Sequence, residues 1–279
     1  MRSRSGVAVE KTLAYGVLVA LAIAVLFPFY WMIITSFKSE DQMRSVVSMF
    51  WPKPFAVENY RQLLAKTEFA AWYGNSVFVA VSSTLLATAV GTIGAYALAR
   101  LKFRGRGFMA SATLITYLVP PSILFIPLYA QIRNLGLADT LSGLIVAYPS
   151  FTVPFVTWLL MGYFESIPEE LEEAAMIDGA TRFGAFWRVV LPLSAPGVLA
   201  AALYAFTQAW NEFLYALVFI TDVKLRTLPV GLSSFITGDV YGWGYLMAGA
   251  VLTTVPVIAA YIYLQKYMVE GLTAGSVKG

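Results

Sequence analysis

The sequence predicts an all-α protein that crosses a lipid bilayer six times, and two observations predict this fold class. Hydrophobic residues make up 59% of the 279 residues, charged residues only 13%, and the mean hydropathy is +0.71, far from the values of a soluble globular domain. Six apolar stretches are each long enough to cross roughly 30 Å of hydrocarbon as a helix. They run from about Leu13 to Phe37, Trp72 to Ala99, Phe108 to Ile132, Leu144 to Phe164, Leu193 to Ile220, and Gly244 to Lys266.

The first span is predicted to remain as a membrane helix. Arg2 and Arg4 precede it, as in a secretory signal peptide, but its apolar run is too long and no small-residue cleavage site follows. We therefore expect a cytoplasmic N-terminus over residues 1–12 and a membrane domain over residues 13–266. The segment from Lys38 to Ala71 is too polar to span the bilayer, and we expect short helices there on the outer side.

The second span carries small residues and ends at a basic cluster. Ala87, Gly91 and Ala95 recur at four-residue spacing, which predicts close contact with a neighbouring helix. The short loop after this span holds Arg100, Lys102, Arg104 and Arg106. Because short cytoplasmic loops are enriched in Lys and Arg, the cluster assigns this loop and both termini to the cytoplasm of a multi-pass cell-membrane protein.

Prolines recur in the later spans. A proline lacks the backbone N–H and clashes with the preceding turn, so a membrane helix kinks or breaks there and frees carbonyl groups that protein or water must satisfy. The positions are Pro120, Pro121, Pro127, Pro149, Pro154 and Pro256. Kinked helices around a cavity suit a transporter, although prolines are common in inert spans too.

The loop over residues 165–192 is predicted to be a helix in water. A bilayer span does not tolerate its density of carboxylates, and the acidic residues are Glu165, Glu169, Glu170, Glu172, Glu173 and Asp178. Pro168 suits a helix start and Gly179 a helix stop, so the helix runs from about Pro168 to Met176. Its short apolar face is expected to comprise Leu171, Ala174, Ala175 and Met176.

The fifth span contains the candidate substrate-pathway residues. They are Tyr204, Gln208, Asn211, Glu212 and Tyr215, and their spacing predicts one face of a continuous helix. An ionised carboxylate in a span costs roughly 2.5 to 3.5 kcal/mol on insertion scales, so Glu212 is a functional candidate. Amide, carboxylate and aromatic groups together suit a sugar. The alternative is that Asn211 and Glu212 merely bond a neighbouring helix.

Composition excludes several function classes. The chain has no cysteine and no histidine, which removes disulfide scaffolds, thiolate nucleophiles, imidazole bases and the commonest transition-metal ligand. No paired nucleophile and base lie at a plausible spacing, so we expect neither an enzyme nor a metal site. The net charge of +3 is attributed to membrane topology, and no nucleic-acid binding is inferred.

The acidic loop carries an ordered set of residues: Glu173, Ala174, Ala175, Asp178, Gly179, Ala180, Phe186, Leu191 and Pro192. This set resembles the EAA loop of ABC importer permeases. The resemblance implies the type I importer fold with six spans, and a coupling helix that enters a cleft of a separate ATPase subunit. Without it, the loop would be interpreted as an ordinary solvated acidic connector.

The tail over residues 267–279 would otherwise be a frayed cytoplasmic terminus. Its small residues resemble the ending of the MalG-like carbohydrate permeases, which implies sugars as substrates. In that family the tail lies between the two ATPase subunits, so contacts are expected from Gly275, Val277, Lys278 and Gly279. Ser276 stands where many relatives have alanine.

Together the resemblances imply a permease subunit of an ATP-driven, binding-protein-dependent sugar importer. Its expected partners are a second, MalF-like permease, two MalK-like ATPase subunits and an extracytoplasmic sugar-binding protein. The chain contains no Gly-Lys dipeptide and hence no Walker A motif, so ATP and Mg²⁺ are assigned to the ATPase subunits and no cofactor to this chain. The alternative is an ion-gradient-driven secondary transporter that uses Glu212, a class that more often has matched repeat halves with broken helices.

Overall fold

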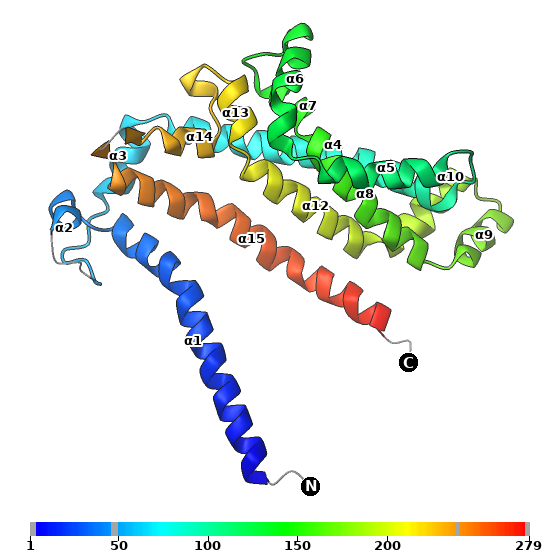
Figure 1. Ribbon diagram of the computed structural model, residues 1–279, viewed down its shortest axis with the longest axis horizontal. Coiled ribbons are helices and arrows are strands. Elements are labelled where there is room, and N and C mark those ends of the chain that lie inside the picture. Colours follow the sequence, from blue (N-terminus) through cyan, green and yellow to red (C-terminus); the bar gives the residue numbers. More distant parts are fainter. Residues whose placement is uncertain (1–3, 46–49, 238–239, 277–279) are drawn as a thin grey trace. The chain divides into compact units, whose positions relative to one another are not determined.

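The computed structural model describes residues 4–45, 50–237 and 240–276, and it is built almost entirely of helices (Figure 1). The strands within these residues are β1 (Ile236–Thr237) and β2 (Val240–Tyr241), a two-residue antiparallel ladder. The predicted all-α class is therefore confirmed. The chain divides into two compact units, Met1–Phe69 with Leu232–Thr254, and Ala70–Gly231 with Val255–Gly279.

The first unit combines the N-terminal span with the short helices that the sequence predicted after it. Its helices are α1 (Arg4–Ser36), α2 (Glu40–Arg44), α3 (Glu58–Lys66) and the beginning of α15 (Trp243–Ser276). Ser39 and Gln42 form a capping box at the start of α2. The buried Asn59 amide donates to the carbonyls of Ser36 and Lys38, both at 2.8 Å, and so joins α3 to the end of α1.

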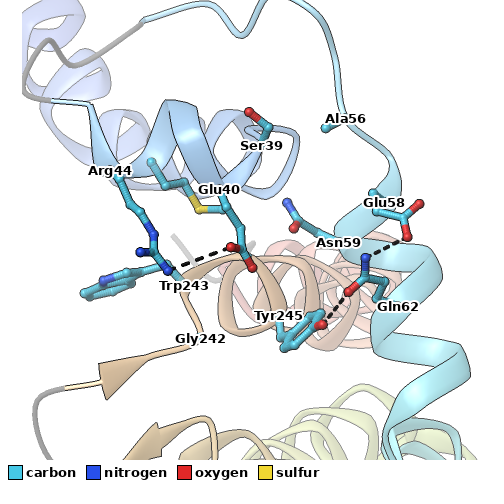
Figure 2. Close-up of a pocket in the computed structure, with 12 residues that line it drawn as sticks. Ser39, Glu40, Arg44, Ala56, Glu58, Asn59, Gln62, Gly242, Trp243 and Tyr245 are labelled. Carbon is cyan, nitrogen blue, oxygen red and sulfur yellow. Dashed lines mark hydrogen bonds and ion pairs between the residues drawn. The ribbon is translucent and has the colours of Figure 1, made fainter.

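An open groove of about 490 Å³ lies in this unit between α2, α3 and the start of α15 (Figure 2). Its polar side chains bond to one another. The Gln62 amide donates to Glu58 at 2.7 Å and accepts from the Tyr245 hydroxyl at 2.6 Å. Gly244 is required beside Asn59, because a Cβ there would overlap the Asn59 side chain.

The second unit is a bundle whose central helix is α8. Its helices, in chain order, are α4 (Phe69–Arg100), α5 (Arg106–Leu118), α6 (Pro121–Asn134), α7 (Leu141–Ala147), α8 (Pro149–Ser166), α9 (Glu169–Ile177), α10 (Arg182–Ala185), the π-helical turn η1 (Phe186–Val190), α11 (Leu191–Leu193), α12 (Ala195–Trp210), α13 (Leu214–Phe219), the 3₁₀ turn η2 (Val223–Leu225), α14 (Leu228–Ser233) and the rest of α15. Helix α8 packs against α5 and α12. The buried core combines residues of α4, α8, η1 and α12.

Small residues bring the helices of this core close together. Ala87 and Ala95 are fully buried, and Gly91 between them faces Val156 of α8, where a Cβ would overlap the valine side chain. Gly197 of α12 packs in the same way against the Tyr163 ring of α8. The predicted contact stripe on the second span is therefore confirmed.

Four of the expected spans are single long apolar helices, and two are bent. These spans are Lys11–Ser36, Phe69–Arg100, Leu141–Ser166, in which α7 and α8 follow each other across Tyr148, and Trp243–Gln265. Helices α5 and α6 meet at 101°, and the segment from Arg182 to Leu193 meets α12 at 77°. Counting each bent pair as one span gives six spans among the described residues, the number that the sequence predicts, but the second pair begins at Arg182 and not at the predicted Leu193.

Two predicted spans are wrong in detail. The stretch from Phe108 to Ile132 is not one helix, because it breaks before Pro121, which has no N–H to continue a helix and disfavours helical backbone in the preceding residue. The stretch from Leu193 to Ile220 is not one helix either, since α12 ends at Trp210 and α13 begins at Leu214.

We predict that Gly91→Ala destabilises the fold by about 1 to 3 kcal/mol, as overpacking of a filled core does. Val156 is fully buried and β-branched, so it has no free rotation with which to make room. Gly94→Ala is the matched control, because its Cβ would lie 3.6 Å from the Thr157 side chain, an ordinary contact. Thermal unfolding in detergent measures both variants, and equal midpoints for the two would contradict the prediction.

Candidate functional site

Helix α9 is a short surface helix with a defined start and stop. Pro168 precedes it with φ −56° and ψ 131°, and its first turn contains Glu169, Glu170 and Glu172, whose charges suit the positive end of the helix dipole. Gly179 ends it in the left-handed region with φ +94°, where most L-residues are strained. The helix predicted from about Pro168 to Met176 is therefore confirmed as Glu169–Ile177.

The face of α9 that points away from the bundle carries exposed apolar side chains. Leu171, Ala174 and Ile177 recur every three residues on this face, with Leu171 45% and Ile177 86% exposed. Glu170 and Glu173 flank them and are also exposed. We call Leu171, Ala174 and Ile177 the apolar face of α9. The sequence interpretation gave Met176 and Ala175 in place of Ile177, and both are only half-exposed.

The inner face of α9 is bonded to the end of α4. The Arg100 guanidinium donates to the Ile167 carbonyl at 2.5 Å and lies 3.5 Å from carboxylate oxygens of Glu169 and Glu172. Tyr96, one turn earlier on α4, donates its hydroxyl to Glu172. We call Tyr96, Arg100 and Glu172 the anchor cluster. The sequence interpretation missed it, because Arg100 counted only as a topological charge and Glu172 as one of an acidic run.

The rest of the predicted coupling loop returns the chain to the core. Ala180 is half-buried, and Thr181 caps α10 by accepting from the backbone N–H of Gly184 at 3.1 Å. Phe186 is buried, with its ring centroid 4.5 Å from that of Tyr96. Leu191 and Pro192 form the first residues of α11. Asp178 caps the end of α9 and is exposed.

The five candidate pathway residues do not share one helical face, which corrects the sequence prediction. Tyr204 and Gln208 are one turn apart on α12, and Tyr204 lies against Phe155, with 3.9 Å between ring centroids. Asn211 is the C-terminal cap residue of α12, and its side-chain amide donates to the Thr207 carbonyl at 2.9 Å.

Glu212 lies in the break between α12 and α13 and starts the second helix. Its carboxylate accepts from the backbone N–H groups of Tyr215 at 2.8 Å and Ala216 at 3.0 Å, and from the Tyr148 hydroxyl at 3.0 Å. Tyr215 donates its own hydroxyl to the Pro121 carbonyl at 2.9 Å. A carboxylate that satisfies the free N–H groups of a helix start competes with helix continuation, which explains the break. The geometry favours the interpretation in which Glu212 holds neighbouring segments, whereas the Asn211 amide bonds within its own helix.

Asp139 fixes the far end of α13. Its backbone is left-handed with φ 55°, and its carboxylate accepts from the Thr221 N–H at 2.7 Å, the Thr221 hydroxyl at 2.8 Å and the Asp222 N–H at 3.1 Å. These hydrogen bonds, first that of the Thr221 hydroxyl, hold the pKa of the Asp139 carboxyl below its ordinary value. The segment that leads into α7 and the loop after α13 are thereby joined.

The C-terminal candidates lie at the limit of the described chain. Gly275 belongs to the last turn of α15, whereas Val277, Lys278 and Gly279 lie outside the described residues. Over the part of the chain that the structure describes, no three acidic side chains converge as metal ligands would.

Comparisons with known proteins agree with this architecture. A family model described as "Binding-protein-dependent transport system inner membrane component" matches residues 74–273. The chain is 37% identical over 265 residues to the trehalose/maltose transport system permease protein MalG of Thermococcus litoralis, covering 94% of each chain. It is 39% identical over 254 residues to the sulfoquinovosyl glycerol transport system permease protein SmoH of Agrobacterium fabrum, covering 91% of this chain and 89% of that one.

A solved structure is similar along nearly the whole chain. It is described as a bacterial ABC transporter involved in the import of the acidic polysaccharide alginate. The TM-score is 0.81 at 26% identity, with 96% of this chain and 99% of that chain covered.

We predict that Glu212→Ala destabilises the protein by about 1 to 2 kcal/mol, the usual cost of losing a helix N-terminal cap. The variant leaves the first N–H groups of α13 and the Tyr148 hydroxyl without their acceptor. Asn211→Ala is the control, since it removes one exposed bond within its own helix. Chemical unfolding in detergent provides the comparison, and a Glu212→Ala variant no less stable than Asn211→Ala would contradict the capping role.

We predict that the Asp139 contacts contribute stability at neutral pH and lose it in acid. Because the folded pKa lies below the unfolded value of about 3.9, the contribution is present above that pH and disappears as pH falls through the folded pKa. Asp139→Asn should therefore lower the unfolding midpoint at pH 6 and have a diminishing effect below about pH 4. A difference between wild type and variant that stayed constant from pH 6 to pH 3 would exclude this assignment.

Proposed function

The chain belongs to the family of binding-protein-dependent transport system inner membrane components, and on this premise we propose that it forms half of the translocation pathway of an ATP-driven importer for saccharides. Members of this family are transport components rather than enzymes. The family fits a polytopic chain with four long apolar helices and two bent pairs. The proposal adds the energy source, the substrate class and the partners.

The observation that carries the proposal is the apolar face of α9. Leu171 and Ile177 are exposed on a helix that also carries four glutamates, and exposed apolar side chains of this kind mark a contact surface. The helix contains Glu173, Ala174 and Ala175 of the EAA resemblance, so we assign the contact to an ATPase subunit. The chain has no Walker A motif, which makes the ATPase subunits the site of ATP and Mg²⁺.

The saccharide class is supported by the relatives. The two permeases described above are named for trehalose or maltose and for sulfoquinovosyl glycerol, and the similar solved structure is named for alginate. All of these cargoes present sugar hydroxyl groups. Tyr204 and Gln208 are the pathway candidates that remain on one helical face, and an amide beside an aromatic ring suits a sugar.

The assembly we propose contains four kinds of component. This chain pairs with a second homologous permease, two ATPase subunits bind on the cytoplasmic side, and an extracytoplasmic sugar-binding protein delivers the cargo. Both termini, the Arg100–Arg106 loop and α9 face the cytoplasm in this arrangement. The tail residues Gly275, Val277, Lys278 and Gly279 are proposed to contact the ATPase subunits.

The alternative, an ion-gradient transporter that uses Glu212, is less well supported. Both carboxylate oxygens of Glu212 accept hydrogen bonds from α13, and one also accepts from Tyr148. A carboxylate that carries ions through a cycle of binding and release would have to give up these bonds at each turnover. The exposed face of α9 has no role in such a transporter.

We predict that Ile177→Glu weakens docking of the ATPase subunits. Ile177 is 86% exposed, so the change leaves the permease fold intact, and a docked isoleucine is worth about 1.5 to 3 kcal/mol, or roughly a ten- to hundredfold loss of affinity. Co-purification of the ATPase subunits from membranes measures the effect. Glu170→Gln is the control, because it changes an exposed residue of α9 outside the apolar face.

Two results would overturn the proposed function. The first is an unchanged amount of bound ATPase with Ile177→Glu. The second is solute accumulation by vesicles that contain only this polypeptide.

A further inference from the structure

The anchor cluster joins α9 to a membrane span through buried charge. The side chains of Arg100 and Glu172 are only 5% and 7% exposed, and their closest charged atoms are 3.5 Å apart. The Arg100 Nε atom has no hydrogen-bond partner, so its interaction with Glu172 is electrostatic. A guanidinium offers several donors in a fixed plane, and Arg100 directs them to groups on both sides of the α9 start.

The contacts of Arg100 bracket the entry into α9. The Ile167 carbonyl precedes the helix, Glu169 is its first residue and Glu172 lies three residues further along the first turn. Pro168 lies between these contacts and restricts the backbone there. Helix α9 cannot turn or move away from α4 without breaking bonds to a buried charge, and breaking one partner of such a pair is strongly unfavourable.

Tyr96 reinforces the same connection from one turn earlier. It lies four residues before Arg100, on the same side of α4, and donates its hydroxyl to Glu172. Its ring packs against Phe186 and against Phe164, with centroid distances of 4.5 and 6.2 Å. The second half of the loop is thus tied to the same point on α4.

A nearby ion pair is exposed, unlike the buried pair of Arg100 and Glu172. Arg106 lies 3.8 Å from Glu165, but these side chains are 35% and 51% exposed. Exposed pairs contribute little, because water screens them and the side chains lose freedom. Among the described residues, three ion pairs connect the α4–α5 region to the α8–α9 region, and only in Arg100–Glu172 are both side chains buried.

We propose that Arg100, with Glu172 and Tyr96, is the positioning element that transmits displacement of α9 to span α4. The proposal rests on the proposed function, in which an ATPase subunit moves α9. The outer face of α9 stays free for the partner while the inner face is fixed to α4. Movement imposed on α9 then reaches the membrane helix instead of being absorbed in the loop.

The test uses the complete reconstituted complex and measures sugar transported per ATP hydrolysed. The main variant is Arg100→Met with Glu172→Met, which removes both buried charges and leaves neither unpaired. We expect at least a tenfold fall in sugar transported per ATP, with the ATPase subunits still bound at wild-type affinity. Arg106→Met is the matched control and should keep the wild-type ratio.

Two milder variants keep the proposal testable if the double variant does not fold. Arg100→Lys keeps the charge but loses the planar fork, and Tyr96→Phe removes one hydroxyl. Each should lower the ratio about two- to fivefold without loss of bound ATPase.

Three results would overturn the proposal. The first is a wild-type ratio in the double variant, or in both milder variants if the double variant does not fold. The second is a ratio lowered equally by Arg106→Met. The third is loss of ATPase binding in the double variant, which would make the cluster part of the docking surface. Failure of the proposed function would instead appear as absence of ATPase binding to the wild-type chain.

Discussion

The buried guanidinium of Arg100 is the constraint on which the arrangement of the coupling segment depends. A charge removed from water must be paired and hydrogen-bonded, and the groups available to it are the Ile167 carbonyl, Glu169 and Glu172. Satisfying Arg100 therefore fixes where α9 begins and which side faces the bundle. The opposite side, with Ile177, is left facing water, and this is the surface we assign to an ATPase subunit.

The helical bundle that contains α4 combines a tightly packed core with breaks between consecutive helices. Gly91 and Gly197 allow α4 and α12 to approach α8 more closely than side chains would permit. The breaks lie between α5 and α6, directly before α12, and between α12 and α13. A displacement of α4 would move the tightly packed core with it. The helices can change direction relative to one another at the breaks.

Much of the fold could be predicted, because apolar composition and the residues that start and stop helices are local features of the sequence. The spans, the small-residue stripe around Gly91, and the helix that stops at Gly179 all follow from residues close together in the sequence. The break after Trp210 could not be predicted from spacing, because it depends on Glu212 bonding to the N–H groups that follow it. The anchor cluster was missed because it pairs Arg100 with a residue far along the chain. The exposure of Ile177 could not be predicted either, because it depends on which face of α9 contacts α4.

The most direct test of the account is the accessibility of α9 to a membrane-impermeant maleimide. The chain has no cysteine, so Ala174→Cys gives a single reactive site on the apolar face, and Leu64→Cys on the exposed side of α3 gives a control expected on the other side of the membrane. We predict that Ala174→Cys is labelled only in inside-out vesicles and is protected when ATPase subunits are bound, while Leu64→Cys is labelled only in right-side-out vesicles. Labelling of Ala174→Cys from the outside, or labelling that bound ATPase does not reduce, would contradict the central claim.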